Sequence, residues 1–221
     1  MKKMTLLAVA AASVMALSAT PSSAKINVAV GPKISTLGFG VEATAKITEK
    51  FNFRTGVNYF KLSKNIPDGK IDYDASLRFL TVSALVDFHP FANGFRLSAG
   101  AMYNGNKFTL DVTPTKNVTF EDVTYTPAQM GKIEATLDFR KVSPYLGIGY
   151  DSAMHNDGNW SFNAEAGVLF QGKPKASVKS SALVATQGAF IEAAKNDLQN
   201  NTNKGYFRFY PVVSIGAKYR F

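Results

Sequence analysis

The stretch that decides the fold is the carboxyl-terminal segment Phe207–Phe221, FRFYPVVSIGAKYRF. Its odd positions carry aromatic and apolar side chains, whereas most of its even positions carry Arg, Ser, Gly or Lys. Because successive side chains of a β-strand point to opposite faces, this alternation predicts a strand with one apolar and one polar face. Such a strand is typical of a transmembrane barrel wall, which has lipid on one side and water on the other.

The same two-residue period recurs upstream. The segments that show it are 37–47, 51–59, 80–88, 95–103, 133–139, 146–150 and 160–170. We expect tight turns at 48–50, at 90–94 and at 141–144, where Pro and Gly or a short polar run interrupt the alternation. The chain is therefore predicted to be all-β, an antiparallel up-and-down transmembrane barrel.

The number of strands depends on which end of the barrel holds the tight turns. Outer-membrane barrels have short periplasmic turns, long outer loops and both chain ends in the periplasm. If the tight turns are periplasmic, residues 26–31 and 175–182 must supply two further strands. Both 8 and 10 strands stay possible, and we favour 10. The outer loops would be 63–70, 113–130, 155–159 and 183–205, and helical spacing of Phe190, Ala194 and Leu198 predicts a short helix in the last loop.

The first 24 residues have the features of a signal peptide. Lys2 and Lys3 precede an apolar run, and Ser22 and Ala24 supply small residues where a signal peptidase cuts. We expect cleavage after Ala24, so that residues 1–24 are the leader and residues 25–221 are the barrel domain.

Composition excludes several classes of protein. Beyond the leader no apolar stretch reaches the roughly 18 residues that a transmembrane helix needs. Cysteine is absent, so disulfides and a lipid-modified cysteine are excluded. Removing Lys2 and Lys3 lowers the net charge from +9 to +7, with lysines scattered rather than clustered. We expect membrane lipid and lipopolysaccharide as partners, and no nucleic acid.

Ten charged residues lie on the parity opposite to the apolar wall and are expected to face the lumen: Glu42, Lys46, Arg54, Asp87, Arg96, Asp138, Arg140, Glu165, Lys218 and Arg220. A narrow lumen cannot hydrate so many charges separately, so opposite signs should pair. Pairing would give an ionic plug; the alternative is a wet, charge-lined pathway for small solutes. Gly167 shares the inward parity, so Gly167→Ser is expected to be tolerated, in contrast to Ala166→Arg on the lipid side.

Three segments resemble strands of small Gram-negative outer-membrane barrels, the OmpA-like and OmpW-like proteins: FRLSAGAMYN (Phe95–Asn104), SPYLGIGYD (Ser143–Asp151) and YPVVSIGAKYRF (Tyr210–Phe221). The resemblance implies an outer-membrane location. It also implies that the chain end, with Val213, Ile215, Tyr219 and Phe221, is a signal for the outer-membrane assembly machinery. The predicted helix near Phe190 departs from the pattern of these families.

Nothing in the sequence favours an enzyme. The two histidines, His89 and His155, are predicted to lie at opposite ends of the barrel, and neither has the neighbours that a catalytic triad needs. The loop acids match no defined calcium loop, so neither a metal nor a cofactor is expected. The leading hypothesis is a non-enzymatic barrel, structural or weakly pore-forming. The alternatives are a channel or transporter for small solutes and a surface adhesin acting through its outer loops; the oligomeric state stays open.

Overall fold

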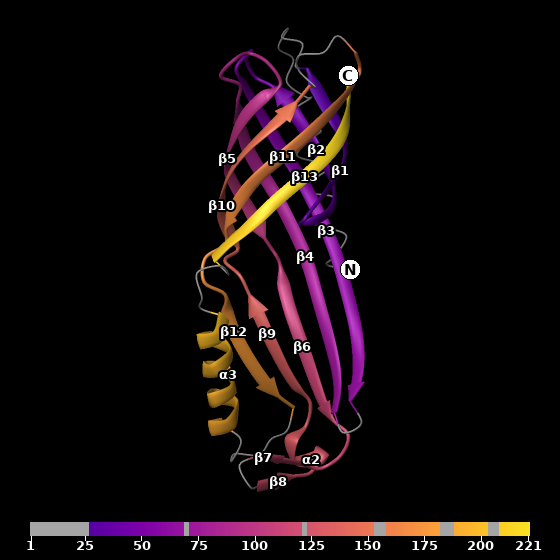
Figure 1. Cartoon of the computed structure of the whole chain (residues 1–221), viewed down its shortest axis with the longest axis vertical. Helices are drawn as coiled ribbons and strands as arrows, with labels where there is room; N and C mark the ends of the chain where they lie inside the picture. The colour runs from indigo at the N-terminus through magenta and orange to yellow at the C-terminus, as the bar shows by residue number, and fades with distance from the viewer. Residues whose placement is uncertain (1–26, 69–70, 121–122, 153–157, 182–187, 203–207) are drawn as a thin grey trace, which may run out of the picture.

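The computed structural model describes residues 27–68, 71–120, 123–152, 158–181, 188–202 and 208–221, and its described part is mainly antiparallel β-structure (Figure 1). The strands are β1 (Val28–Ser35), β2 (Gly38–Lys46), β3 (Phe51–Asp68), β4 (Ile71–Phe88), β5 (Phe95–Asn104), β6 (Lys107–Pro114), β7 (Val118–Phe120), β8 (Val123–Tyr125), β9 (Ile133–Asp138), β10 (Val142–Asp151), β11 (Trp160–Phe170), β12 (Lys175–Ser180) and β13 (Phe209–Arg220). Two described helices are α2 (Pro127–Met130) and α3 (Gly188–Thr202).

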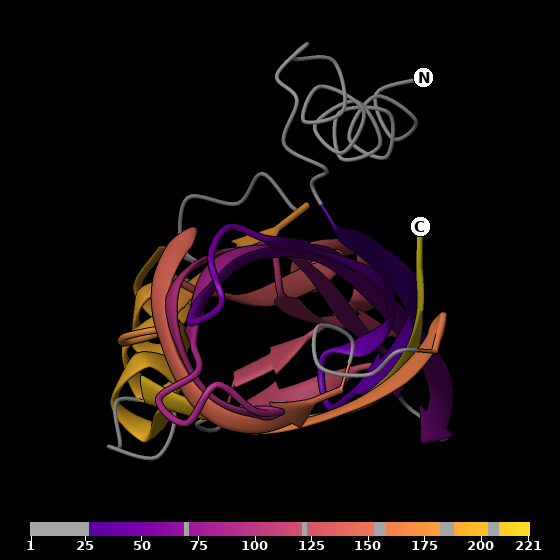
Figure 2. The ribbon, with the colours of Figure 1, turned by 90° about the horizontal axis from the view of Figure 1, so that it is seen from above.

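Eight of these strands close into a barrel. The pairing runs β4-β3-β2-β1-β13-β11-β10-β5, and β5 pairs back onto β4. Viewed from above, the strands surround a common axis (Figure 2). The predicted antiparallel barrel is confirmed, but the preference for ten strands is wrong, because the wall has eight.

One end of the barrel carries short connections, and we call it the turn end. Residues 47–50 join β2 to β3 there, and residues 89–94 join β4 to β5. The connection from β10 to β11 lies at the same end, since Asp151 N donates to Gly94 O (2.7 Å). The loop 155–159, expected on the opposite side, therefore belongs to the turn end, although residues 153–157 lie outside the described residues.

The wall continues far beyond the barrel on one side. β3 and β4 are 18 residues long, and their outer halves pair with each other. β6 pairs with β4, β9 with β6, and β12 with β9. We call this five-stranded continuation, made of 60–68, 71–79, β6, β9 and β12, the extension; it fills much of the lower half of Figure 1.

Three strands of the extension continue barrel strands rather than starting new ones. β5 passes into β6 through Gly105 and Asn106, where Gly105 N donates to Leu80 O (2.8 Å) and Asn106 Oδ1 accepts from Leu80 N (3.1 Å). In the same way β9 leads into β10, and β11 leads into β12. The two continued strands lie side by side, because β10 pairs with β11 and β9 pairs with β12. The hairpin predicted at 141–144 and the return strand predicted at 175–182 are therefore wrong. A local break in a strand interrupts the alternation of side chains just as a turn does. Periodicity alone therefore could not distinguish a break from a turn.

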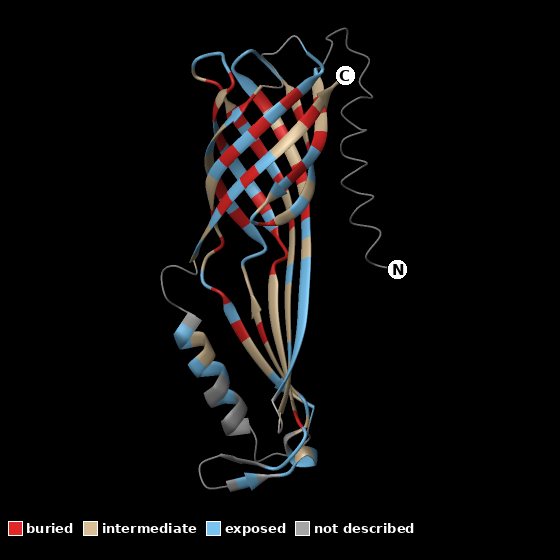
Figure 3. Ribbon diagram, turned by 45° about the vertical axis from the view of Figure 1, so that its right-hand side comes forward, coloured by how far each residue is buried: buried red, intermediate tan, exposed pale blue. Residues whose placement is uncertain are grey.

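The outer wall of the barrel is apolar and the lumen side is polar. In β11, Trp160 and Phe162 are 63% and 73% exposed, whereas Ser161 and Asn163 between and after them are 1% and 4% exposed. The pattern appears as alternating bands in the upper half of Figure 3. The alternation predicted for the segments that form the barrel is confirmed, with an exception at Leu37. The segment 133–139, also predicted as a wall strand, lies in the extension instead.

Leu37 was expected on the outer wall but is only 1% exposed. It lies in the two-residue turn between β1 and β2, and the next residue, Gly38, has a φ of +107° that favours glycine. The turn directs the Leu37 side chain inward, so the strand alternation begins only after it.

Aromatic side chains gather at both ends of the outer wall. At the turn end Phe51 stacks on Phe88 (5.1 Å between ring centroids), and Trp160 meets Tyr219 edge-on (5.4 Å). At the other end Phe170 meets Phe209 (5.6 Å). The ten steps of β11 that separate the two groups span about 25 Å at a rise of about 3.3 Å and a tilt of about 40°.

In the extension the inward face of the sheet is apolar and the outward face is polar, the reverse of the barrel. The inward side chains that pair across the five strands are Leu62, Leu77, Phe108, Leu137 and Ala176. The opposite parity becomes polar, with Lys61, Arg78, Lys107, Asp138 and Lys175 in the matching row. The extension is thus an amphipathic sheet with its apolar side turned toward the barrel axis.

Helix α3 matches the short helix predicted near Phe190. It packs beside β12, and the Gln199 side chain accepts from Ala176 N (3.0 Å) and donates to Pro174 O (2.9 Å). This side chain occupies backbone groups on the edge of the extension. Neither described helix is long and apolar enough to cross a membrane.

The structure leaves no room for a side chain at Gly167, which argues against the sequence expectation. A Cβ at this position would overlap the Tyr145 hydroxyl and lie 2.6 Å from the Leu146 carbonyl oxygen. The inward parity was right, but a buried tyrosine already fills the space that a polar substitution would need.

We therefore predict that Ala166→Arg and Gly167→Ser are both destabilising, for different reasons. Ala166→Arg places a charge in the apolar wall and should cost about 2–4 kcal/mol, whereas Gly167→Ser overpacks the lumen and should cost about 1–3 kcal/mol. Urea unfolding in lipid vesicles measures both. Ala166→Leu is the control and should leave the midpoint nearly unchanged; a Gly167→Ser midpoint equal to wild type would contradict the described packing.

Candidate functional site

Each of the eight barrel strands contributes one charged side chain to the lumen. In chain order they are Lys33, Glu42, Arg54, Asp87, Arg96, Asp151, Glu165 and Lys218, and none is more than 6% exposed. We call this group the lumen network. It contains four cations and four carboxylates, so its formal charge is zero.

Arg54 from β3 lies at the centre of the lumen network and contacts three carboxylates. Its Nε lies 2.8 Å from Asp87 Oδ2, its Nη1 lies 3.0 Å from Glu42 Oε2, and its Nη2 pairs with Glu165. These partners come from β4, β2 and β11. One guanidinium therefore ties opposite sides of the barrel together.

The remaining pairs close a cycle of alternating charge. Arg96 Nη2 lies 2.6 Å from Glu165 Oε2, and Arg96 Nη1 lies 2.7 Å from Asp151 Oδ2. Lys218 Nζ lies 2.7 Å from Asp151 Oδ2 and 2.8 Å from Glu42 Oε1, which returns to Arg54. Lys33 Nζ joins the cycle at Glu42 Oε2 (2.8 Å).

Neutral polar groups satisfy further atoms of the lumen network. Ser98 Oγ donates to Asp87 Oδ1 (2.6 Å), and Tyr145 Oη donates to Glu165. Lys218 Nζ donates to Thr44 Oγ1 (2.7 Å), and Asn163 Nδ2 donates to Glu42 Oε1 (3.3 Å). The desolvation cost of burying these charges is offset by dense, charge-assisted hydrogen bonding.

An apolar layer lies on the extension side of the lumen network. Its members are Leu37, Leu85, Met102, Tyr145, Leu169 and Val212, with Tyr210 packed against them. In β4, for example, Leu85 is one inward position farther from the turn end than Asp87. The lumen is thus occupied first by ion pairs and then by packed side chains, and a solute moving along the axis would have to displace both.

The structure brings together six of the ten residues predicted to face the lumen as a network: Glu42, Arg54, Asp87, Arg96, Glu165 and Lys218. The other four lie elsewhere. Asp138 belongs to β9 in the extension and pairs with Lys141 (3.6 Å), and Arg140 is exposed beside it. Lys46 and Arg220 are partly exposed near the turn end.

Sequence reasoning missed Lys33 and Asp151. Lys33 follows Gly31 and Pro32, which hid the continuation of β1 beyond residue 31. Asp151 is the last residue of β10 and resembled the start of a polar loop. Its parity with Gly147 and Gly149 was the signal that could have placed it inside.

The candidates for other chemistry lie apart from the lumen network. His89 is 1% exposed, with Nε2 2.9 Å from Asn52 Nδ2 and Nδ1 2.8 Å from Asn93 O, in the predicted turn. His155 lies outside the described residues. Among the described residues no group of three or more His, Asp or Glu could hold a metal ion. In the extension, Asp111 accepts a hydrogen bond from Lys132 (2.8 Å), which raises the pKa of Lys132.

The residues assigned to the assembly signal lie on the outer side of β13 and at its end. Val213, Ile215 and Phe221 are 53%, 61% and 78% exposed, and Tyr219 contacts both Phe221 and Trp160. Recognition of these residues by assembly machinery stays a prediction. The cleavage site at Ala24 lies outside the described residues.

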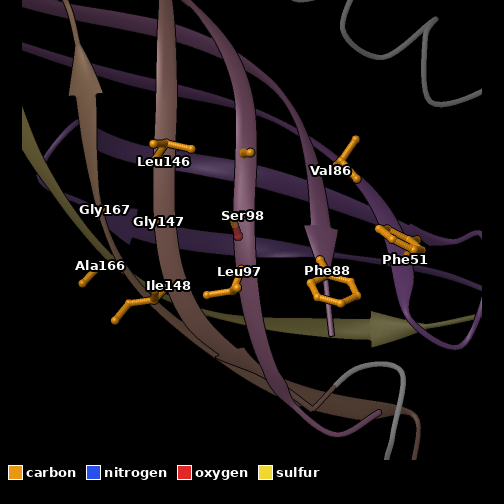
Figure 4. A pocket seen from close by; sticks show the side chains of 11 residues that line it. Phe51, Val86, Phe88, Leu97, Ser98, Leu146, Gly147, Ile148, Ala166 and Gly167 are labelled. Carbon is orange, nitrogen blue, oxygen red and sulfur yellow. The ribbon is translucent and has the colours of Figure 1, made fainter. Parts of the chain in front are cut away.

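The outer wall also has a shallow apolar hollow over β4, β5, β10 and β11 (Figure 4). Its lining includes the small residues Ala99, Gly147 and Ala166 beside the larger Leu146 and Ile148. The lining contains no charged side chain. The hollow suits hydrocarbon, which is the material expected around the barrel.

We predict that Arg54→Met destabilises the barrel by about 3–5 kcal/mol, because Glu42, Asp87 and Glu165 each lose a buried partner. The unfolding free energy in lipid vesicles, followed by urea titration, measures the loss. Adding Glu165→Gln to Arg54→Met should recover part of it by removing one uncompensated charge. Arg140→Met, at an exposed arginine, is the control and should stay within about 0.5 kcal/mol of wild type. Similar losses for Arg54→Met and Arg140→Met would exclude a structural role of the lumen network.

Two solved structures from Acinetobacter baumannii share this architecture. CarO2 superposes with a TM-score of 0.57 and 18% identity, over 90% of this chain and 100% of the CarO2 chain. CarO superposes with a TM-score of 0.55 and 19% identity, over 87% of this chain and 97% of the CarO chain. No protein-family model and no curated protein matches the sequence.

At these identities the likeness concerns the fold. It agrees with the eight strands counted from the pairing and with the small-barrel resemblance seen in the sequence. The chain has the fold of a small, closed, eight-stranded antiparallel barrel with short helices, and it resembles the CarO proteins of Acinetobacter.

Proposed function

We propose that the protein is a non-enzymatic outer-membrane β-barrel that closes its own lumen and serves as a structural component of the envelope. The location is supported by the outer wall. Exposed apolar side chains cover it, aromatic groups lie at both ends, and the height of about 25 Å suits the apolar band of an outer membrane. The turn end faces the periplasm in this proposal, and the extension lies outside the cell.

The observation that carries the closed lumen is the lumen network of buried ion pairs. Every barrel strand supplies one member, opposite charges are equal in number, and an apolar layer lies on the extension side of the network. A conducting pathway lined by charge needs water around each charge. In the lumen network those positions are taken by the opposite charge, which favours a plug over a pore.

Planar-bilayer recording tests this proposal. The wild-type protein, inserted at single-molecule density, is expected to give no current steps. The variant Arg54→Ser/Arg96→Ser/Tyr145→Ala removes the three largest fully buried side chains from the lumen, and it is expected to give small steps. This variant shows that the assay detects a passage of this size.

Folding of the variant is checked first by the shift in gel mobility that intact barrels show when loaded without heating. Reproducible steps from the wild-type protein would overturn the closed lumen and favour the alternative of a channel for small solutes. If neither protein gives current steps although the folded variant is in the membrane, the ion pairs alone do not close the lumen.

A second candidate, recognition of a surface outside the cell, is favoured by the size of the extension. Two strands of 18 residues, three continuing strands and helix α3 project beyond the barrel. Attachment of intact cells to host matrix, compared between wild type and a deletion of residues 115–130, tests this role. Equal attachment of the two strains would count against it.

A further inference from the structure

Three basic side chains lie directly opposite one another on adjacent strands of the extension. Lys61 of β3 is the register partner of Arg78 of β4, and Arg78 is the register partner of Lys107 of β6. We call these residues the basic row. Directly paired residues share one face of the sheet on strands about 4.8 Å apart. β3, β4 and β6 run side by side in Figure 1.

The row lies on the convex side of the wall. Lys61 shares its parity with Tyr59, which is 51% exposed on the outer wall, whereas Leu62 and Asn58 share the inward parity. Lys61 and Arg78 are exposed and Lys107 is half-buried. Three cations therefore point away from the barrel axis, into the surroundings of the wall.

Like charges directly opposite in a sheet are destabilising, and the protein does little to compensate these. None of the three forms an ion pair with any other described residue. Asp138 is the register partner of Lys107 on the far side, but its ion pair is with Lys141 (3.6 Å). An arrangement of repelling charges with few protein partners implies that the partner comes from outside.

The height of the row indicates what that partner is. Along β3 the row follows Tyr59 by one outward position, and along the β5 to β6 path it follows Tyr103, which is 41% exposed. Aromatic residues of this kind mark the boundary between hydrocarbon and headgroups. The basic row therefore lies at the level of the headgroups, on the outer side of the membrane.

We propose that Lys61, Arg78 and Lys107 form a binding site for the phosphate groups of a phosphorylated glycolipid in the outer leaflet. The inference rests on the proposed outer-membrane location. The Arg78 guanidinium can hold a phosphate through two parallel hydrogen bonds, and the flanking lysines add point charges on either side. The acyl chains of the same lipid would lie along the apolar outer wall of the barrel, on the turn-end side of the basic row.

Native mass spectrometry of the detergent-purified protein tests the site. The probes are bisphosphorylated lipid A, lipid A without phosphates, and inorganic phosphate alone. The variant Lys61→Gln/Arg78→Gln/Lys107→Gln should bind bisphosphorylated lipid A on the order of a hundredfold more weakly than wild type, at about 1 kcal/mol per basic residue. Lipid A without phosphates should bind wild type as weakly.

The matched control removes three lysines outside the row. Lys64, Lys116 and Lys179 are exposed residues of the extension and its loop, and Lys64→Gln/Lys116→Gln/Lys179→Gln makes the same change in net charge. Binding by this control should stay within about twofold of wild type. Equal weakening in both triple variants would reduce the effect to net charge and overturn the site.

The melting temperature gives a second readout, because the difference between wild type and variant should depend on whether lipid A is present. In neutral detergent the basic-row variant should melt at or above the wild-type temperature, because repulsion between the three charges is removed. With bisphosphorylated lipid A added, wild type should gain stability and the variant should not. A variant that melts lower in both conditions would show that the row acts within the protein.

The outcomes separate this inference from the proposed function. Inorganic phosphate binding as tightly as the lipid would assign the site to free phosphate and overturn the glycolipid. If the basic-row variant binds the lipid as tightly as wild type, and the protein inserts into bilayers without giving current steps, the site is overturned and the closed barrel is left intact. Failure of the wild type to insert into bilayers would instead remove the membrane location itself.

Discussion

The contact on which the structure depends is that between the Arg54 guanidinium and three carboxylates from three other strands. A buried cation without partners would carry a large desolvation penalty, and so would each of the carboxylates. Together with Arg96 and Lys218 they form a neutral assembly of six residues from six strands, which is favourable only when those strands stand in the correct register. The lumen network therefore gives the barrel specificity, because a slip of one residue would turn these charges toward the apolar outer wall.

The same chain solves two burial problems with opposite arrangements. In the barrel the apolar side chains face outward, as the proposed lipid surroundings require, and the polar ones pair within. In the extension Leu77, Phe108 and Leu137 face the axis, and charged or hydroxyl residues face outward, as expected for a sheet in water. The exchange occurs near Gly105 and Asn106, where the strand path shifts. In the proposed outer-membrane location, this switch in polarity marks the level at which lipid gives way to water.

Periodicity predicted the barrel class, the wall-facing residues of β13 and β11, and most of the lumen charges, because strand parity is a strictly local property. It could not predict strand direction or count. The break at 139–141 looks like a turn in sequence, yet β9 and β10 run in the same direction on one track. Pairing between distant segments, such as β12 with β9, depends on register over the whole sheet. Asp151 and Lys33 were missed for local reasons, since Asp151 ends its strand beside a polar loop and Gly31 and Pro32 precede Lys33.

The uneven height of the wall determines how force passes through the molecule. β3 and β4 run without interruption from the turn end into the extension, whereas the paths β5–β6, β9–β10 and β11–β12 are each interrupted between the barrel and the extension. A force on the extension is therefore transmitted through the continuous β3–β4 hairpin, whereas the interrupted strands can bend at their breaks. A load on the extension would reach the barrel through β3 and β4, the strands that hold Arg54 and its partner Asp87.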